Sequence, residues 1–123
     1  MKYLTLNDID CYKRSLKLSA YVWDIVLTWD WFAKRTVGVQ FVTAVDSMSA
    51  NIAEGFGRFT KLDKIHHFRI SFGSLMESLD WNQKAKERKL LTKDQYAHIL
   101  SELKQLPKEI NQLIQYTRNK LKQ

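Results

Sequence analysis

Apolar residues recur at steps of three and four along most of this chain, and that spacing predicts amphipathic helices. The first row predicts a helix over residues 8–30, with Asn7 as its N-cap. Its inward face is expected to be Ile9, Tyr12, Leu16, Ala20, Trp23 and Leu27. Aromatic residues gather at its end and just beyond, at Trp23, Trp29, Trp31 and Phe32. We expect these rings to close one end of a core or of an interface, and a platform for stacking nucleobases is the alternative.

A second helix is predicted to start after Thr36, which can act as its N-cap, and to end at Gly55 and Gly57. Several β-branched residues in its first half would also suit a strand, but the spacing of the apolar positions favours a helix. The two glycines are expected to supply the backbone freedom that ends it. Its inward face is predicted to be Val39, Val42, Val45, Met48 or Ser49, Ile52 and Phe56.

The third helix is predicted to begin after Thr60, which forms a capping pair with Asp63, and to reach about Leu90. A row of apolar residues gives it an inward face, formed by Ile65, Phe68, Phe72, Leu75 and Leu79. Cations crowd its C-terminal half, where they suit the negative end of the helix dipole.

The fourth helix is predicted to follow a capping box made by Thr92 and Gln95, and Pro107 is expected to kink it. Its inward face has nearly heptad spacing: Tyr96, Ile99, Leu103, Leu106, Ile110, Leu113 and Thr117. A second apolar row lies beside the first and suggests contact with another subunit: Leu100, Ile114 and Leu121. Four helices with short connections predict an all-α fold, an antiparallel up-down four-helix bundle that forms one domain over residues 1–123.

Composition supports this fold class, because one proline and four glycines in 123 residues are too few for a chain of turns or strands. The formal charge of +7 favours polyanions such as nucleic acid as partners, although a solvated basic surface would give the same number. Cys11 is the only cysteine, so no intrachain disulfide can form. No signal peptide is recognised, and residues 21–32 are too short and too charged to cross a membrane, so a cytoplasmic protein is expected.

No catalytic, metal or cofactor site is predicted. A di-iron centre in a four-helix bundle needs a Glu-x-x-His motif, and no glutamate here has histidine three residues later. His66 and His67 are adjacent and point in different directions on a helix, so they cannot bind one metal together. Cys11 has no assigned base, and the glycines after Glu54 do not form a phosphate-binding loop, so an enzyme is not expected.

A set of polar residues lies on the facing sides of the second and third predicted helices. Gly73 would let the two backbones approach, and the carboxylates of Glu54 and Glu77 would accept hydrogen bonds from Asn51 and Ser74. This set can be an intrachain network, a contact between subunits or a ligand site. Its members are Ser47, Asn51, Glu54, Gly73, Ser74 and Glu77.

The run from Ala50 to Arg58, followed by Gly73, Ser74, Leu75 and Glu77, resembles the signature of the 23S rRNA-intervening-sequence protein family, also called four-helix-bundle proteins. The resemblance implies a homopentamer of up-down bundles and no established enzymatic activity. A related branch contains the Avd accessory proteins of diversity-generating retroelements, which bind nucleic acid and partner a reverse transcriptase. The signature is expected to be structural and covers Ser47, Asn51, Glu54, Gly55, Gly57, Gly73, Ser74 and Glu77.

Charge and resemblance together predict a non-enzymatic cytosolic homopentamer that binds RNA or DNA, with little dependence on sequence and strong dependence on salt. The alternative is an adaptor for a partner protein such as a reverse transcriptase. The cations expected to contribute are Arg58, Lys61, Lys64, Arg69, Lys84, Lys86, Arg88 and Lys89, with Lys13, Arg14 and Lys17 as further members.

Overall fold

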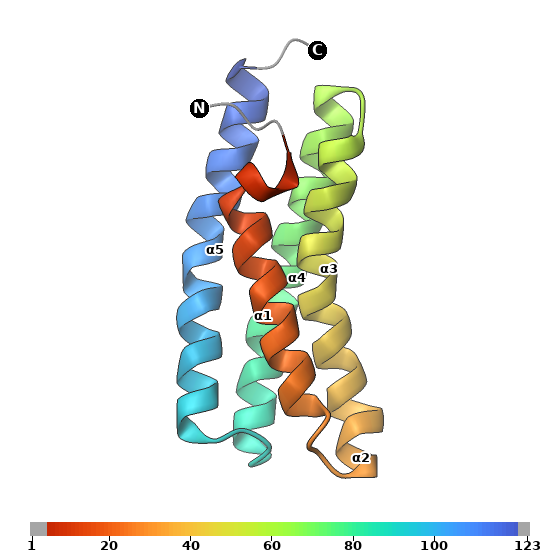
Figure 1. The fold of residues 1–123 in the computed structure, drawn as a ribbon, viewed down its shortest axis with the longest axis vertical. Helices are drawn as coiled ribbons and strands as arrows, with labels where there is room; N and C mark the ends of the chain where they lie inside the picture. Colours follow the sequence, from red (N-terminus) through yellow and green to blue (C-terminus); the bar gives the residue numbers. More distant parts are fainter. Residues whose placement is uncertain (1–4, 121–123) are drawn as a thin grey trace.

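The computed structural model describes residues 5–120, and nearly all of them lie in helices that run alternately up and down (Figure 1). No strand is found among these residues. A short 3₁₀ turn, η1 (Leu6–Asp8), precedes the first long helix. The predicted four-helix bundle is therefore confirmed, and its long helices are α1 (Asp10–Val26), α3 (Val39–Gly57), α4 (Lys61–Glu87) and α5 (Lys93–Lys120).

Each long helix packs mainly against two neighbours. Helix α1 contacts α3 and α5, and α4 contacts the same two helices from the other side. Helices α1 and α4 therefore occupy opposite corners of the bundle. The core runs along the axis between all four helices, and its largest fully buried side chains include Leu18, Phe41, Met48, Ile52, Phe68, Leu75, Leu103, Leu106 and Ile110.

Two helix starts are capped as the sequence predicts. The Thr60 hydroxyl accepts a hydrogen bond from the backbone N–H of Asp63 at 3.2 Å, which begins α4. The hydroxyl of Thr92 accepts from the N–H of Gln95 at 3.1 Å, and the Gln95 side chain accepts from the N–H of Thr92 at 2.9 Å. This capping box satisfies donors that have no partner inside the helix.

The other two predicted N-caps are wrong. Helix α1 begins at Asp10 after η1, so Asn7 lies inside that turn and does not cap the helix. The helical stretch predicted to start after Thr36 begins earlier, because the Asp30 carboxylate accepts from the N–H of Ala33 at 2.9 Å. It passes through α2 (Trp31–Ala33) and a π-helical turn, η2 (Lys34–Gly38), into α3.

The predicted inward face of α1 is also wrong over most of its length. Leu16, Trp23 and Leu27 are 47%, 53% and 53% exposed, whereas Leu18 and Val22 are buried. The buried face includes two serines whose hydroxyls bond to backbone carbonyls, Ser15 to Cys11 at 2.7 Å and Ser19 to Val45 at 3.2 Å. The spacing of apolar side chains does not predict a core face that contains serines, because serine is counted as polar. These serines can be buried because their hydroxyls form hydrogen bonds to backbone carbonyls.

The glycines have different roles from those predicted. No described glycine has a positive φ, so neither Gly55 nor Gly57 supplies a left-handed turn. A Cβ added at Gly55 would lie 2.6 Å from Phe68 Cε1 and 2.9 Å from the Lys64 carbonyl oxygen. Gly73, predicted to allow close approach, is exposed and has no atom within 4 Å of an added Cβ. The close contact between α3 and α4 is therefore made at Gly55.

The second apolar row of α5 does not form a separate outer face. Ile114 is only 6% exposed and belongs to the core, and Leu100 is half-buried. Leu121 lies outside the described residues. Pro107 lies within α5, which continues as a helix on both sides of it. Of the two described members of this row, Ile114 therefore packs in the core of its own chain, and the predicted contact with another subunit stays a prediction.

Candidate functional site

The polar set between α3 and α4 forms a network within one chain. Ser74 Oγ on α4 donates to Ser47 Oγ on α3 at 2.8 Å. The Asn51 amide donates to that same hydroxyl at 3.0 Å and to the Ser47 carbonyl at 2.9 Å. His67 Nδ1 lies 3.3 Å from Asn51 Oδ1 and joins the network, which sequence reasoning missed. His67 precedes Ser74 by seven residues and so shares its helix face, a spacing that identifies it in retrospect.

The two carboxylates predicted for this network are not part of it. Glu54 is exposed and binds Arg58 Nε at 2.9 Å, so these two predicted site residues form a surface ion pair along α3. Glu77 is exposed and makes no hydrogen bond to Asn51 or Ser74. Keeping both charges in water avoids the large free-energy penalty for burying them, and the network consists of hydroxyl, amide and imidazole groups.

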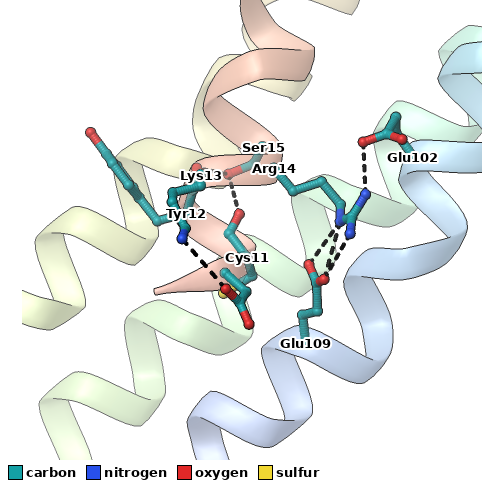
Figure 2. Close-up of polar contacts among 8 residues, drawn as sticks. Cys11, Tyr12, Lys13, Arg14, Ser15, Glu102 and Glu109 are labelled. Carbon is teal, nitrogen blue, oxygen red and sulfur yellow. Dashed lines mark hydrogen bonds and ion pairs between the residues drawn. The ribbon is translucent and has the colours of Figure 1, made fainter. Parts of the chain in front are cut away.

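A cluster of charged residues joins α1 to α5 (Figure 2). Arg14 Nε and one terminal nitrogen each bind Glu109 at 3.0 Å, and the other terminal nitrogen binds Glu102 at 2.8 Å. Hydrogen bonding to Glu109 is the main cause that raises the pKa of the Arg14 guanidinium. Arg14 was predicted to lie on a basic surface, but two half-buried carboxylates neutralise its charge. The sequence signal was the seven-residue spacing of Glu102 and Glu109 on one face of α5.

Cys11 lies one turn before Ser15 and is fully buried (Figure 2). Burial, assisted by the nearby negative charge of Glu109, raises the pKa of its thiol from 9.0 to about 12. Because the thiolate is the reactive form of cysteine, this residue is inert in the folded chain at neutral pH.

The raised pKa of Cys11 predicts a loss of stability in alkali. In the unfolded chain the thiol ionises above pH 9.0, whereas in the folded chain it stays protonated until about pH 12, so the stabilisation is complete below pH 9.0 and is lost as pH rises through this window. Between pH 8 and pH 10 this group alone should lower the unfolding free energy by about 1 kcal/mol. Urea unfolding of the natural chain and of Cys11→Ala at both pH values measures the difference, and equal losses in the two proteins would contradict the prediction.

Three of the predicted nucleic-acid-binding lysines are held by partners in the chain. Lys61 Nζ donates to the Arg118 carbonyl at 2.9 Å, and Lys64 Nζ donates to the Phe56 carbonyl at 2.8 Å. Partial burial lowers the pKa of Lys64. Lys84 pairs with Asp80 at 2.6 Å. These amino groups have fewer free donors for a phosphate than their positions in the sequence imply.

The cations near the α4–α5 turn lie at the opposite end of the bundle from the start of α4. Lys86 Nζ lies 4.5 Å from the centre of the Tyr96 ring. Arg88 and Lys89 are exposed, and Lys89 has a φ of 61°, which places it in the left-handed region at the turn. Arg88 lines a surface pocket of about 470 Å³ together with Asp30, and that carboxylate reduces the attraction of the pocket for anions.

Two arginines share a cleft between α4 and α5 with a volume of about 310 Å³. Arg69 and Arg118 are exposed, and neither guanidinium is in an ion pair with any residue of the described range. No carboxylate lines the cleft, and two side-chain amides do. We call it the α4–α5 cleft, and it is lined by Arg69, Phe72, Asn111, Ile114, Gln115 and Arg118.

Sequence reasoning found Arg69 but missed the second arginine of the cleft. Asn111 lies three residues before the buried Ile114, and Arg118 lies four residues after it, so all three share one side of α5. That side of α5 meets α4. The heptad pattern of α5 predicts only which residues face the core, so it assigns no function to Asn111 or Arg118, which lie beside the core positions.

Residues 5–120 contain neither a cluster of metal ligands nor a membrane-spanning helix. No three His, Cys, Asp or Glu side chains in this range are placed so that they could hold a metal ion. His66 and His67 have ring centres 5.4 Å apart in an edge-on arrangement. None of the helices in the range combines the length and the apolar character needed to cross a bilayer.

The fold and surfaces define a basic four-helix-bundle protein with a carboxylate-free arginine cleft. The 23S rRNA-intervening sequence protein family matches residues 7–112, and the chain belongs to that family. A crystal structure of a protein of unknown function from the S23 ribosomal protein family of Bacteroides thetaiotaomicron has a TM-score of 0.75 and 18% identity, covering 85% of this chain and 97% of that one. At this identity the likeness supports the fold alone. The curated proteins include no match to the chain.

Proposed function

We propose that the protein is a non-enzymatic homopentamer that binds RNA or DNA through its basic surfaces. The observation that carries the nucleic-acid part is the α4–α5 cleft, where Arg69 and Arg118 meet without a carboxylate. A guanidinium group binds phosphate oxygens through paired hydrogen bonds, and its charge persists at every working pH. The amides of Asn111 and Gln115 add donors for phosphate or sugar oxygens on the same hollow.

The burial and hydrogen bonding of the cysteine and of three buried serines support the proposal that the protein is not an enzyme. The Cys11 thiol is buried and protonated at neutral pH. The buried hydroxyls of Ser15, Ser71 and Ser78 each donate to a backbone carbonyl, at 2.7, 2.9 and 2.8 Å. None of these hydroxyls is paired with a base that would make it a nucleophile.

Self-association strengthens the electrostatic argument. One chain has a formal charge of +7, so five chains would carry five times +7, or +35. Five α4–α5 clefts in one assembly would bind a single polyanion together, since each contact raises the effective concentration of the strand at the next. Binding should therefore be tight at low salt and weaken steeply as salt rises.

Removing both arginines of the cleft is expected to weaken nucleic-acid binding about tenfold or more and to flatten its dependence on salt, because fewer phosphates are neutralised. The variant Arg69→Ala/Arg118→Ala would be compared with Arg88→Ala/Lys93→Ala, which removes two exposed cations from the other end of the bundle. Filter retention of labelled single-stranded RNA and DNA over a range of salt concentrations measures both effects.

Each outcome of this comparison is informative. An equal loss in both double variants would mean that the total charge matters and the cleft does not. Loss only in Arg88→Ala/Lys93→Ala would move the binding surface to the α4–α5 turn. No retention of either nucleic acid by the natural protein, even at low salt, would overturn the proposed function.

A further inference from the structure

The aromatic residues that follow α1 separate into one buried ring and two exposed rings. Trp29 is 8% exposed and packs in the core, whereas Trp31 and Phe32 on α2 are each 69% exposed. The α4–α5 turn lies at the same end of the bundle as α2 (Figure 1). Neighbouring exposed rings mark an interaction site, and of the rings in this segment only these two are accessible to a ligand.

Phe32 lines the surface pocket of about 470 Å³ that also includes Arg88, and Trp31 does not. The pocket lies between residues 30–37 and the α4–α5 turn, and its volume is in the range of small-molecule sites. We call it the α2 pocket. Its apolar wall is formed by Ala33, Val37 and Leu90, and its polar residues are Asp30, Thr36 and Arg88.

Backbone hydrogen bonds hold both sides of the α2 pocket in place. On one side the Asp30 carboxylate accepts from the Ala33 N–H, and the Thr36 hydroxyl donates to the Phe32 carbonyl at 2.7 Å. Thr36 belongs to the π-helical turn η2, a rare conformation that occurs frequently at functional sites. On the other side the N–H of Leu90 bonds back to the last turns of α4 at 2.9 Å. The pocket is therefore formed before a ligand binds.

Two opposite charges line the α2 pocket without meeting each other. The Asp30 carboxylate bonds to the Ala33 N–H through Oδ1, and its Oδ2 bonds to no residue in the part of the chain that the structure describes. Within residues 5–120 the Arg88 guanidinium is in no ion pair. An acceptor and a group of donors therefore share one hollow. A neutral ligand with donors on one edge and acceptors on another would satisfy both.

A guanine base has this arrangement of donors and acceptors. Its N1–H and N2 amino groups lie on one edge, where a single carboxylate can accept from both, and its O6 and N7 atoms accept from an arginine. Its flat surface stacks on an aromatic ring such as Phe32. Adenine offers only its amino group to the carboxylate, and uracil offers only one N–H. The negative charge of Asp30 also disfavours a phosphate group, so the pocket suits a base better than the backbone of a strand.

We propose that the α2 pocket holds one unpaired guanine of a single-stranded nucleic acid, stacked on Phe32 with its donor edge on Asp30 and its acceptor edge on Arg88. The base must be unpaired, because its donor edge is occupied in a duplex. This inference rests on the nucleic-acid binding in the proposed function and adds a base preference at a second site. Arg88 follows Arg69 by 19 residues, so the pocket lies about 28 Å along α4 from the α4–α5 cleft.

The test compares labelled oligouridine strands of about fifteen nucleotides, long enough to reach both sites, that differ at one central position. Fluorescence anisotropy of the natural protein should show about tenfold tighter binding when that position is guanine, because stacking and paired hydrogen bonds are gained. The same guanine in a duplex should give no advantage. Equal affinity of single strands with and without guanine, or the same advantage in the duplex, would overturn the inference.

Removing the stacking ring tests its place in the pocket. Phe32→Ala should lose most of the guanine advantage and bind plain oligouridine nearly as well as the natural protein. Trp31→Ala is the matched control, since it removes an equally exposed ring that does not line the pocket, and it should keep the advantage. Loss of the advantage in Trp31→Ala alone would overturn the assignment. Binding to phosphatidylserine vesicles that both variants lose, with no guanine advantage, would assign the rings to a membrane surface instead.

Asp30→Asn separates base recognition from folding, because asparagine also caps a helix and should leave the circular dichroism spectrum unchanged. Inosine lacks the N2 amino group of guanine. In the natural protein its strand should bind about fivefold more weakly than the guanine strand, whereas Asp30→Asn should bind the two strands equally. An inosine penalty that persists in Asp30→Asn would mean that the amino group contacts another residue, and it would overturn the role given to Asp30.

These outcomes are separable from failure of the proposed function. If all strands bind the natural protein equally and Arg69→Ala/Arg118→Ala weakens their binding, the α4–α5 cleft stands and the α2 pocket is wrong. If the natural protein binds no strand even at low salt, both are wrong. The comparison with Arg88→Ala/Lys93→Ala uses plain oligouridine, so that the loss of Arg88 there reports charge and not base recognition.

Discussion

Replacing Gly55 with valine is expected to lower the free energy of unfolding by about 3 kcal/mol, because overpacking a tight contact forces backbone to move. A Cβ at this position lies 2.6 Å from the Phe68 ring and 2.9 Å from the carbonyl oxygen of Lys64. The ring can rotate by a small amount, but the carbonyl belongs to the first turns of α4. The new methyl groups therefore push α3 and α4 apart at this contact.

Gly57→Val is the matched control, since it makes the same change two residues later on the same helix. A Cβ at Gly57 meets no atom within 4 Å, so the cost there should stay below about 1 kcal/mol. Urea unfolding followed by circular dichroism gives both values. Equal stability of the two variants would show that the contact between α3 and α4 adjusts freely and that Gly55 is not needed for close approach.

Replacing Arg14 with methionine is expected to lower the free energy of unfolding by about 2 to 3 kcal/mol, since the two carboxylates that it joins lose their shared cation. Side-chain exposures of 27% for Glu102 and 16% for Glu109 leave some access for water, which keeps the loss below that of a fully buried pair. The pKa of Arg14 is raised from an already high value, so its charge contributes to stability throughout the neutral and moderately alkaline range.

A triple variant, Arg14→Met/Glu102→Gln/Glu109→Gln, tests the cause of that loss. If repulsion and uncompensated charge are responsible, neutral amides should restore most of the stability measured by urea unfolding. No recovery would assign the loss to packing of the arginine side chain instead. Folded Arg14→Met should also retain labelled RNA as well as the natural protein, because this cation is already neutralised in the cluster.

Local signals in the sequence identified the helices and half of their starts. Thr60 with Asp63, and Thr92 with Gln95, are capping patterns whose partners lie three residues away, so the sequence alone contains the whole interaction. Asp30 was missed because it lies in the aromatic segment that was interpreted as the end of the preceding helix. Its side chain makes the same kind of bond to Ala33.

The orientation of α1 could not be derived from the same signals. An exposed row of this helix, which contains Leu16, Trp23 and Leu27, is apolar, whereas its buried face includes two serines. The serines can be buried because carbonyl groups of their own helix and of α3 accept their hydrogen bonds. Such bonds depend on the final packing. Helix periodicity therefore showed that an apolar row exists without showing which of two rows faces the core.

The sequence predicts only part of each candidate site, because the other part depends on how the helices pack. Ser47, Asn51 and Ser74 were identified because they share facing sides of consecutive helices, and the structure joins them. The carboxylates were added on polarity alone, although their charges are better solvated outside the bundle. The α4–α5 cleft combines flanks of two helices about fifty residues apart in sequence, and no local pattern connects Arg69 with Arg118.

The exposed apolar side chains of α1 and α4 bear on how the proposed homopentamer would depend on the amount of protein in the cell. In a single chain Trp23 and Leu62 are exposed to water, and exposed apolar side chains promote aggregation. Ring closure requires several copies at once, so it sets in over a narrow range of concentration. A small change in expression would then switch the protein between a weakly binding single chain and a multivalent assembly, without any ligand or modification.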